Sequence, residues 1–305
     1  GDNDLRFRQE VLLGVGGIRL LDTLGIHPML FHCNEGHAAF AGLERLRKYV
    51  QDDKLSFPEA LEVVRASTVF TTHTPVPAGH DVFTEDTLRT YIPHYASRLG
   101  ISWDDFMNLG RIHENDPEEK FSMSVLAARL SQEMNGVSRI HGRVTQKMFR
   151  DLYPGYFPEE LHISYVTNGV HYPTWVSQPM RWLYQEIFPD RFINEQHDVS
   201  HWQAIQQIDP IRLWEIRNGL RKDLIRSLRE RLRRDMTLRQ ESPSMIFRMT
   251  GPLNEHALTI CFARRFATYK RAHLLFTNLE RLSKIVNNPE RPVQFIYAGK
   301  ARSEE

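Results

Sequence analysis

The feature that most constrains the fold is a repeated order in which a short apolar or β-branched run ends on a polar residue and a helix follows. The run Met29–Phe31 ends at His32, Thr68–Thr72 leads into His73, and Ile163–Thr167 leads into Asn168. Runs of this length and composition favour strands. Helices are expected between and before them, over 9–24 (with interruptions by glycine), 38–49, 58–66, 86–98 and 122–150. The alternation predicts an α/β fold with a parallel sheet.

The same order returns towards the C-terminus. After a long helix expected over 211–234, the runs Leu258–Phe262 and Val293–Tyr297 read as strands on either side of a helix over 269–286. Such a βαβ unit implies a second parallel sheet. We therefore expect a seam near Asn168 and a second sheet domain that starts near Leu258.

The balance of charge excludes several classes of partner. Thirty-nine Lys and Arg oppose 38 Asp and Glu in 305 residues, so a net charge of +1 offers no global field for nucleic acid or an anionic membrane. No run approaches the ~20 apolar residues of a membrane span, and the polar opening at Gly1–Asp4 is not a signal peptide. Cys33 and Cys261 both lie in apolar runs, which predicts buried thiols in a reducing compartment. We expect a cytoplasmic protein that, lacking an initiator Met, belongs to a longer chain.

The segment His32–His37 places two imidazoles and a carboxylate within six residues, at the turn from a strand to a helix. Such crowding is compatible with a metal site, but the spacing matches no zinc pattern, and no metal is predicted. The structural alternative is that Asn34 or Glu35 caps the next helix and His37 packs against the sheet.

The loop after the second strand carries two prolines and a glycine, Pro75, Pro77 and Gly79. These residues stiffen the loop, which displays His73 and Thr74 at the sheet edge. Ligands of open α/β sheets bind beyond the carboxyl ends of the strands. Both residues are therefore candidate ligand contacts, and the alternative is a turn that merely contains histidines.

A cluster of cations follows the strand Leu258–Phe262. Arg264, Arg265, Lys270 and Arg271 place four positive charges in eight positions, where a helix is expected to begin. Backbone N–H groups, helix dipole and side-chain charge would then act on one anion, for which phosphate is the natural choice. The alternative is a solvated charged face, which is the interpretation that we give to the basic helix over 221–234.

The segment Asn168–Trp175 is the fourth candidate. Asn168 and Gly169 allow the backbone to turn closely past a ligand, and Trp175 could stack on a flat ring. The alternative is a turn between domains with a tryptophan in the core.

Taken in order, the motifs NEGHAAF, FTTHTPVPAGHDVF, NGVH with a following Trp, ARRFATYKRA and YAGKA resemble the α-glucan (glycogen, starch or maltodextrin) phosphorylase family, over nearly the whole chain. The resemblance implies a GT-B fold, in which two Rossmann-like parallel-sheet domains face each other across a cleft, both incomplete here. Residues 1–166 would be the C-terminal part of the first domain, and 167–305 the inter-domain helices and the start of the second.

The implied reaction is reversible phosphorolysis of an α-1,4-glucan by inorganic phosphate, which gives glucose 1-phosphate with pyridoxal 5'-phosphate as cofactor. The cofactor's own phosphate would act as the acid–base group. A homo-oligomer is possible, and neither nucleic acid nor membrane is an expected partner.

The resemblance also implies a role for individual residues. His73 resembles a histidine whose backbone carbonyl contacts the glucosyl unit, and Thr74 lies beside it in the same motif. Asn168 resembles the asparagine that holds the 6-hydroxyl, and Tyr269 a tyrosine on the 2-hydroxyl. Arg265 and Lys270 resemble the pair that binds the substrate phosphate, and Glu35 resembles an acidic residue near the sugar. Arg264 resembles a basic residue near the cofactor phosphate, and Trp175 an aromatic residue beside the cofactor ring.

The sequence departs from the family pattern in what it lacks. It contains no Ser-Gly-Thr-Ser segment ending in Met-Lys, which carries the cofactor lysine in the family, and Lys300 is not that lysine. The glycine loop of the other half of the cleft is absent as well. The expectation is that these 305 residues alone form no Schiff base and catalyse no phosphorolysis.

Three other functions are compatible with parts of the sequence. A GT-B nucleotide-sugar glucosyltransferase similar to glycogen synthase should differ at the cation cluster, which there serves a diphosphate. A non-catalytic glucan-binding fragment would need no reactive groups. A metal-dependent hydrolase would use His32, Glu35 and His37.

Overall fold

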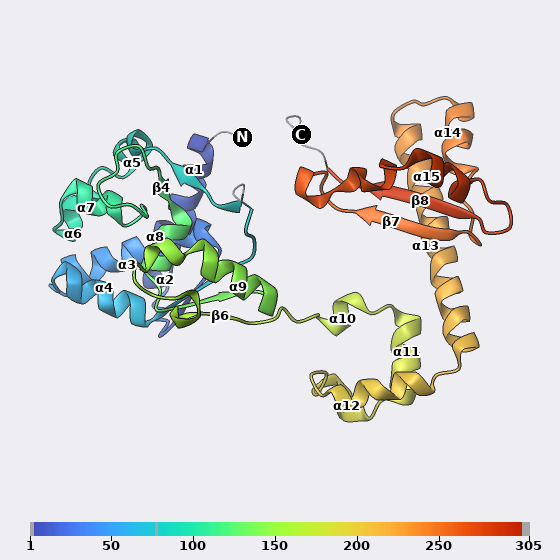
Figure 1. Cartoon of the computed structure of the whole chain (residues 1–305), viewed down its shortest axis with the longest axis horizontal. Coiled ribbons are helices and arrows are strands. Elements are labelled where there is room, and N and C mark those ends of the chain that lie inside the picture. The colour runs from blue at the N-terminus through green and yellow to red at the C-terminus, as the bar shows by residue number, and fades with distance from the viewer. Residues whose placement is uncertain (1–2, 77–78, 301–305) are drawn as a thin grey trace. The chain divides into compact units, whose positions relative to one another are not determined.

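The structure is a computed structural model and describes residues 3–76 and 79–300. The chain divides into two compact units, with the boundary between Val170 and His171. Each unit contains its own parallel strands with helices beside them (Figure 1).

The first unit is built on a four-stranded parallel sheet in the order β1-β2-β5-β6. Its strands are β1 (Phe31–Asn34), β2 (Thr68–Thr72), β5 (Glu133–Gly136) and β6 (Ile163–Tyr165). The register aligns Asn34, Thr71, Asn135 and Ser164 in one row. All four strands therefore end at nearly the same level, which gives the sheet one continuous carboxyl edge. The predicted α/β class with parallel sheets is confirmed.

Helical segments surround this sheet. They are α1 (Asn3–Val11), the π-helical η1 (Leu12–Gly16), α2 (Gly17–Thr23), η2 (Gly36–Ala38), α3 (Phe40–Gln51), α4 (Phe57–Ala66), α5 (Glu85–Tyr91), α6 (Tyr95–Leu99), α7 (Trp103–Asn108), α8 (Met123–Arg129), α9 (Arg139–Met148), η4 (Arg150–Leu152) and η5 (Pro158–Glu160). A short antiparallel pair, β3 (Val82–Phe83) and β4 (Phe121–Ser122), lies beside them.

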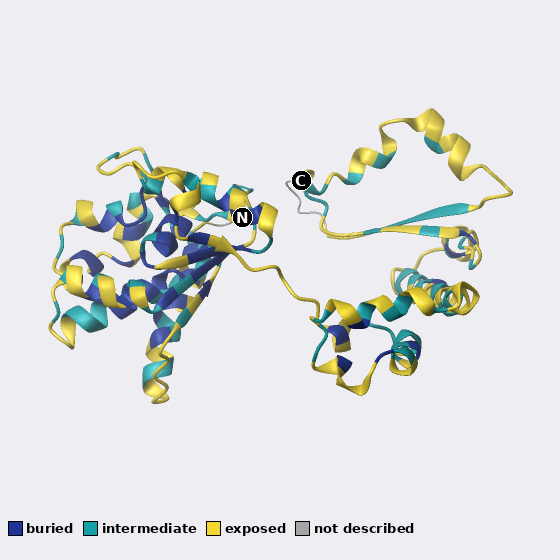
Figure 2. Ribbon diagram, turned by 60° about the horizontal axis from the view of Figure 1, so that its bottom comes forward, coloured by how far each residue is buried: buried dark blue, intermediate teal, exposed yellow. Residues whose placement is uncertain are grey.

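The core of the first unit lies between the sheet and these helices. Helix α3 packs against η1, α4 and α6, while α9 packs against β5 and β6. Phe7, Phe40 and Phe70 are fully buried there, and the buried residues are concentrated in this unit (Figure 2). Large apolar side chains from both helices and strands thus hold the sheet in place.

Two predictions for the strands of this unit are wrong. β1 covers Phe31–Asn34 rather than 29–31, so His32 lies within the strand and does not end it. β5 interrupts the helix expected over 122–150. Its sequence, Glu133–Gly136, contains no apolar run. Pairing with β2 on one side and β6 on the other makes it a strand, because tertiary contacts outweigh local propensity.

Two predicted helices also differ from the structure. The glycines over 9–24 do not interrupt the helix but lie in or beside η1, whose wider π turn continues α1 into α2 and packs against α3. The helix expected over 86–98 divides into α5 and α6, because the backbone leaves the helical conformation at Ile92 (φ −132, ψ 42), before Pro93.

The second unit contains mostly helices and a two-stranded parallel sheet. Its elements are α10 (Tyr172–Trp175), α11 (Gln178–Ile187), η6 (Asp190–Ile193), α12 (Val199–Trp202), η7 (Gln203–Gln207), α13 (Pro210–Leu238), α14 (Pro243–Thr250), β7 (Leu258–Ala263), η8 (Thr268–Lys270), η9 (Ala272–Phe276), α15 (Leu279–Val286) and β8 (Val293–Ala298). A small aromatic core forms around Tyr172, Phe188 and Phe192.

The βαβ order of the second unit is confirmed, but its helix is shorter than expected. Only α15 is α-helical, and 3₁₀ turns precede it. Arg271 has a left-handed backbone (φ 56), which breaks the helix expected over 269–286. The prediction that both thiols are buried holds for Cys33 and is wrong for Cys261, which lies exposed on β7.

Candidate functional site

The ends of four strands meet at the carboxyl edge of the first sheet. Glu35 follows β1, His73 follows β2, Val137 follows β5, and Asn168 lies just beyond β6. The backbone N–H of Glu35 donates to the carbonyl oxygen of Thr71 at 2.8 Å, and that of Asn168 donates to Val137 at 3.2 Å. The fold therefore brings three of the predicted motifs to one edge.

Glu35 has a backbone conformation that is costly for any residue with a side chain. Its φ of 70° and ψ of 167° fall in a region that glycine normally occupies, at a cost of roughly 1–3 kcal/mol. Its Oε1 accepts a hydrogen bond from the backbone N–H of His73 at 2.5 Å and lies 3.2 Å from His73 Nδ1. The alternative in which Glu35 or Asn34 caps the next helix is wrong, since neither η2 nor α3 has a side-chain cap.

His80 holds the loop that carries Thr74. Its Nε2 lies 2.8 Å from the carbonyl oxygen of Thr74, and its Nδ1 lies 2.7 Å from Ser124 Oγ. Because a carbonyl can only accept, Nε2 must carry the proton, and in the neutral ring Nδ1 then accepts from the Ser124 hydroxyl. Gly36 completes the arrangement, since a Cβ there would lie 2.9 Å from both the backbone nitrogen and Oγ of Ser124.

A chain of polar groups crosses the sheet just inside this edge. Asn135 donates from Nδ2 to the carbonyl oxygen of Gly136 at 3.2 Å, which leaves Oδ1 to accept from Thr71 Oγ1 at 2.8 Å. The hydroxyl proton of Thr71 is thereby used, so His32 Nε2 must donate to Thr71 Oγ1 across their 2.7 Å contact. His32 thus takes part in the sheet. Within residues 3–76 and 79–300, no group of three His, Cys, Asp or Glu side chains could hold a metal ion.

The sequence analysis missed His141 at this edge. Val137 donates its backbone N–H to His141 Nδ1 at 3.2 Å, so the neutral ring carries its proton on Nε2, which is buried without a hydrogen-bond partner among the described residues. Burial lowers the pKa of His141, and the charge of Glu35 opposes this effect. The sequence did contain one signal for this region. Ser138 is a typical N-cap, and it marks the start of α9 shortly after β5.

The cation cluster forms a loop, residues 264–271, that follows β7 in the second unit. Within the described part of the chain, Arg264, Arg265 and Lys270 form no ion pair with a carboxylate, and Lys270 Nζ lies 4.3 Å from the centre of the Tyr269 ring. The expected helix dipole is absent, because 3₁₀ turns replace the start of the helix. Any anion at this loop would therefore be held by side-chain charge and loop N–H groups.

The two residues that follow β8 fix the cation loop. Phe266 donates its backbone N–H to the carbonyl oxygen of Lys300 at 3.0 Å. Gly299 lies so close that a Cβ there would be 2.0 Å from the carbonyl oxygen of Arg264, so only glycine fits. The motif YAGK therefore positions the loop. Trp175 lies in α10 with 75% of its surface exposed.

The chain matches one family model and several known proteins. The model of the family described as "Carbohydrate phosphorylase" matches residues 26–304. The chain belongs to the carbohydrate phosphorylase family. It is 42% identical to the maltodextrin phosphorylase of Thermococcus litoralis over 98% of its own length and 34% of the relative's, and 41% identical to the glycogen phosphorylase of Mycobacterium tuberculosis over 99% and 36%. The glycogen phosphorylase of Aquifex aeolicus is 37% identical, over 98% and 43%.

The comparisons confirm the family that the motifs predicted. They favour this family over the alternative of a glucosyltransferase similar to glycogen synthase. The chain spans about a third of the length of the phosphorylases from T. litoralis and M. tuberculosis. In the described ranges, every helix is too short or too polar to cross a membrane.

Proposed function

We propose that this chain supplies sugar and phosphate contacts of an α-glucan phosphorylase, a transferase that cleaves an α-1,4-glucan with inorganic phosphate and releases glucose 1-phosphate. The cation loop carries the proposal. The positive side chains of Arg264, Arg265 and Lys270 lack carboxylate partners among the described residues. They follow a parallel strand, in a chain of the carbohydrate phosphorylase family. The names of the relatives, maltodextrin and glycogen phosphorylase, support the same class of substrate.

On the sugar side, we assign substrate contacts to His73, Thr74 and Asn168. The chemistry at this site is the attack of a phosphate oxygen on C1 of the terminal glucosyl unit, while the bond from C1 to the 4-oxygen of the next unit breaks. The proton that the attacking hydrogen phosphate gives up ends on that 4-oxygen, which leaves as a hydroxyl. The backbone carbonyl of His73 would stabilise the positive charge that develops at C1. Glu35 supports this role, because its carboxylate fixes both the backbone N–H and the ring of His73.

On the phosphate side, Arg265 and Lys270 would hold the attacking phosphate, and Tyr269 would contact the 2-hydroxyl of the sugar. A phosphate dianion beside a second phosphate is repelled unless fixed cations neutralise both. A loop whose cations lack counter-ions among residues 3–76 and 79–300 meets this requirement, since their charge is available to a ligand.

Pyridoxal 5'-phosphate, when bound, supplies that second phosphate as an acid–base group. The residues present suit such a cofactor: Arg264 has no carboxylate partner within the described chain, and the exposed Trp175 offers a ring face. The attachment lysine would lie in a part of the whole enzyme outside these 305 residues. Residues 1–166 and 167–305 would belong to two Rossmann-like domains of a cytoplasmic GT-B enzyme, which could form a homo-oligomer.

Titration calorimetry of the chain with glucose 1-phosphate tests the phosphate site. The double variant Arg265→Met/Lys270→Met should weaken binding about tenfold or more, because charge-assisted hydrogen bonds are lost. The matched control, Lys222→Met/Arg234→Met, removes two exposed charges from α13 and should leave binding unchanged. Equal losses in both variants would show non-specific attraction and contradict the site.

The reaction itself is tested in an enzyme of full length that contains this chain. Maltoheptaose and inorganic phosphate should yield glucose 1-phosphate. Transfer of glucose from a nucleoside diphosphate sugar, with no phosphorolysis, would instead support a glucosyltransferase and reject the proposal.

A further inference from the structure

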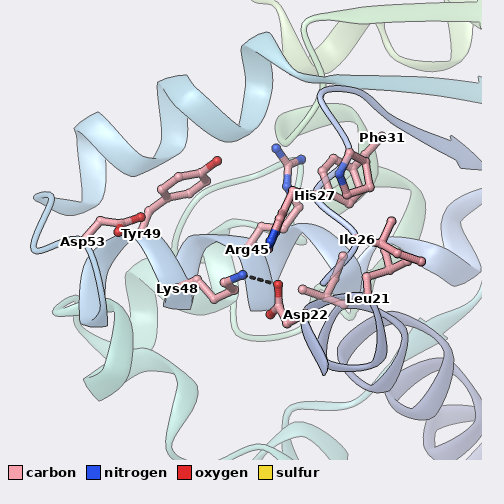
Figure 3. Close-up of a pocket in the computed structure, with 11 residues that line it drawn as sticks. Leu21, Asp22, Ile26, His27, Phe31, Arg45, Lys48, Tyr49 and Asp53 are labelled. Carbon is pink, nitrogen blue, oxygen red and sulfur yellow. Dashed lines mark hydrogen bonds and ion pairs between the residues drawn. The ribbon is translucent and has the colours of Figure 1, made fainter. Parts of the chain in front are cut away.

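A cavity of about 230 Å³ lies at the opposite, amino-terminal end of the first sheet. Figure 3 shows its wall, which is formed by the end of α2, the start of β1 and one side of α3. Ile18, Leu21 and Phe31 contribute apolar surface, while Arg45, Lys48 and Tyr49 contribute polar groups. The carboxylates of Asp22 and Asp53 also line the cavity, and that of Asp22 is paired with Lys48. The length of β1 separates this cavity from Glu35, so the two sites are distinct.

Arg45 is the unusual residue in this wall, because it is charged and yet buried, with 5% of the residue's surface exposed. Nη1 donates to Thr68 Oγ1 at 2.7 Å, and Nη2 donates to Ser67 Oγ. Both hydroxyls donate their own protons to carbonyl oxygens in the last turn of α4, so they act on Arg45 only as acceptors. The guanidinium carbon lies 3.9 Å from the centre of the Phe31 ring.

The charge of Arg45 has no acidic counterpart in the described chain, whereas its neighbours are paired. Lys48 Nζ is paired with Asp22, as the dashed line in Figure 3 marks, and Arg47 is paired with Glu44. Arg111, which is as deeply buried as Arg45, has the carboxylate of Glu85 at 3.4 Å. Desolvation lowers the pKa of Arg45, as it does for a buried cation that lacks a counter-ion.

We propose that this cavity binds a small organic or inorganic oxyanion, with a phosphate or carboxylate head on Arg45 and any apolar body against Leu21 and Phe31. A guanidinium held in place by hydroxyls and placed over a ring is oriented before the ligand arrives, and it recognises planar or tetrahedral oxyanions through N–H groups that Ser67 and Thr68 do not use. The volume lies below the roughly 300–1,000 Å³ of typical drug-sized sites. The ligand is therefore a single small molecule and not an oligosaccharide.

Amide hydrogen exchange on the 305-residue chain tests this site, with inorganic phosphate and benzoate as the two probes. The Arg265→Met/Lys270→Met background removes the proposed phosphate site of the second unit, so the result does not depend on the proposed function. We expect saturable protection of peptides covering 26–31 and 45–53. Protection by both probes assigns a general oxyanion site. Protection by benzoate alone assigns a carboxylate site with an apolar wall. Protection by phosphate alone assigns a phosphate site.

Two variants and one control variant make the test decisive. Arg45→Met should abolish the protection, while Leu21→Trp should fill the cavity and abolish it with Arg45 intact. Arg47→Met, which removes a neighbouring charge on the same helix, should retain it. Absence of protection in the parent chain overturns the proposal, and protection that survives in Arg45→Met shows an adventitious ion only and overturns it as well.

Discussion

The carboxylate of Glu35 accepts a hydrogen bond of 2.5 Å from the backbone N–H of His73, and the same oxygen lies 3.2 Å from the ring nitrogen Nδ1 of that histidine. The Glu35 side chain thus holds both the backbone and the imidazole of His73, the residue that follows β2. The strained φ of 70° at Glu35 is maintained in this arrangement. Strain retained beside strand ends is typical of a site that must be rigid.

Loss of this contact should loosen the segment around His73. Glu35→Ala removes the acceptor and should raise the exchange rate of the His73 amide about tenfold or more, because a charge-assisted hydrogen bond is lost. Glu35→Gln keeps a neutral acceptor and should have a smaller effect. Amide exchange resolved at residues 72–76 provides the measurement. Glu118→Gln, an exposed control in the same unit, should leave the rate unchanged, and equal rates in Glu35→Ala and the parent chain would contradict the assigned role.

Gly36 should not tolerate a larger side chain. Gly36→Ala places a methyl group 2.9 Å from the backbone nitrogen of Ser124, and overpacking of this kind costs typically about 1–3 kcal/mol. Gly169→Ala is the matched control, since nothing lies within 4 Å of its Cβ position, and it should change stability by less than about 0.5 kcal/mol. Urea-dependent amide exchange in core peptides of α3 and β2 measures both. A Gly36→Ala variant as stable as the control would show that the helix α8 moves freely away from η2.

Glu10 predicts a pH dependence of stability. It is almost fully buried on α1, with Arg6 Nε at 2.9 Å from Oε1, and Arg6 also bonds Asp81 at 2.8 Å. Burial raises the pKa of Glu10 to about 8, and Asp81 contributes to the rise, although Arg6 acts in the opposite direction. The folded state then keeps a proton that the unfolded state releases above pH ~4.5. This contribution is complete at low pH and is lost as pH rises to about 8, with a slope of up to ~1.4 kcal/mol per pH unit.

Glu10→Gln should remove this dependence. The variant should unfold at a higher temperature than the parent chain at pH 8.5, and the advantage should shrink at pH 6. Thermal unfolding of the first unit, monitored through amide exchange in α1, measures the difference. Parallel pH profiles in variant and parent would show that Glu10 does not titrate in this range.

The two cysteines should differ sharply in reactivity. Cys33 is buried, and desolvation raises the pKa of its thiol to about 11, so little thiolate forms at pH 8. Cys261 is exposed on β7. An aromatic disulfide reagent should therefore label one thiol rapidly in the native chain and the second only after denaturation. Cys261→Ser should abolish the rapid phase, and a rapid phase that persists in Cys261→Ser would contradict the burial of Cys33.

Strand ends were the most reliable guide to the candidate site. β-Branched and apolar runs predicted β2, β7 and β8 closely, because such residues suit a buried parallel sheet. The residues after β2 and β6 were predicted to lie at a ligand-binding edge, and the structure brings His73 and Asn168 there. Their roles with substrate remain predictions.

β5 shows where local sequence was insufficient. Glu133, Asn135 and Gly136 have little strand propensity, so the strand and the buried His141 that follows it were both missed. Likewise, the sequence did not reveal the left-handed conformation of Arg271 or the exposure of Cys261 on β7.

The sequence alone thus determined the α/β class, the family and the candidate residues, because periodicity, strand composition and ordered motifs are local properties of the chain. Tertiary structure determined that the Glu35 carboxylate holds His73, that His141 is buried at the same edge, and that Arg45 is desolvated with no counter-ion in the part of the chain that the structure describes. These relationships join residues that are distant along the chain or depend on burial. Only sheet register and side-chain packing set them.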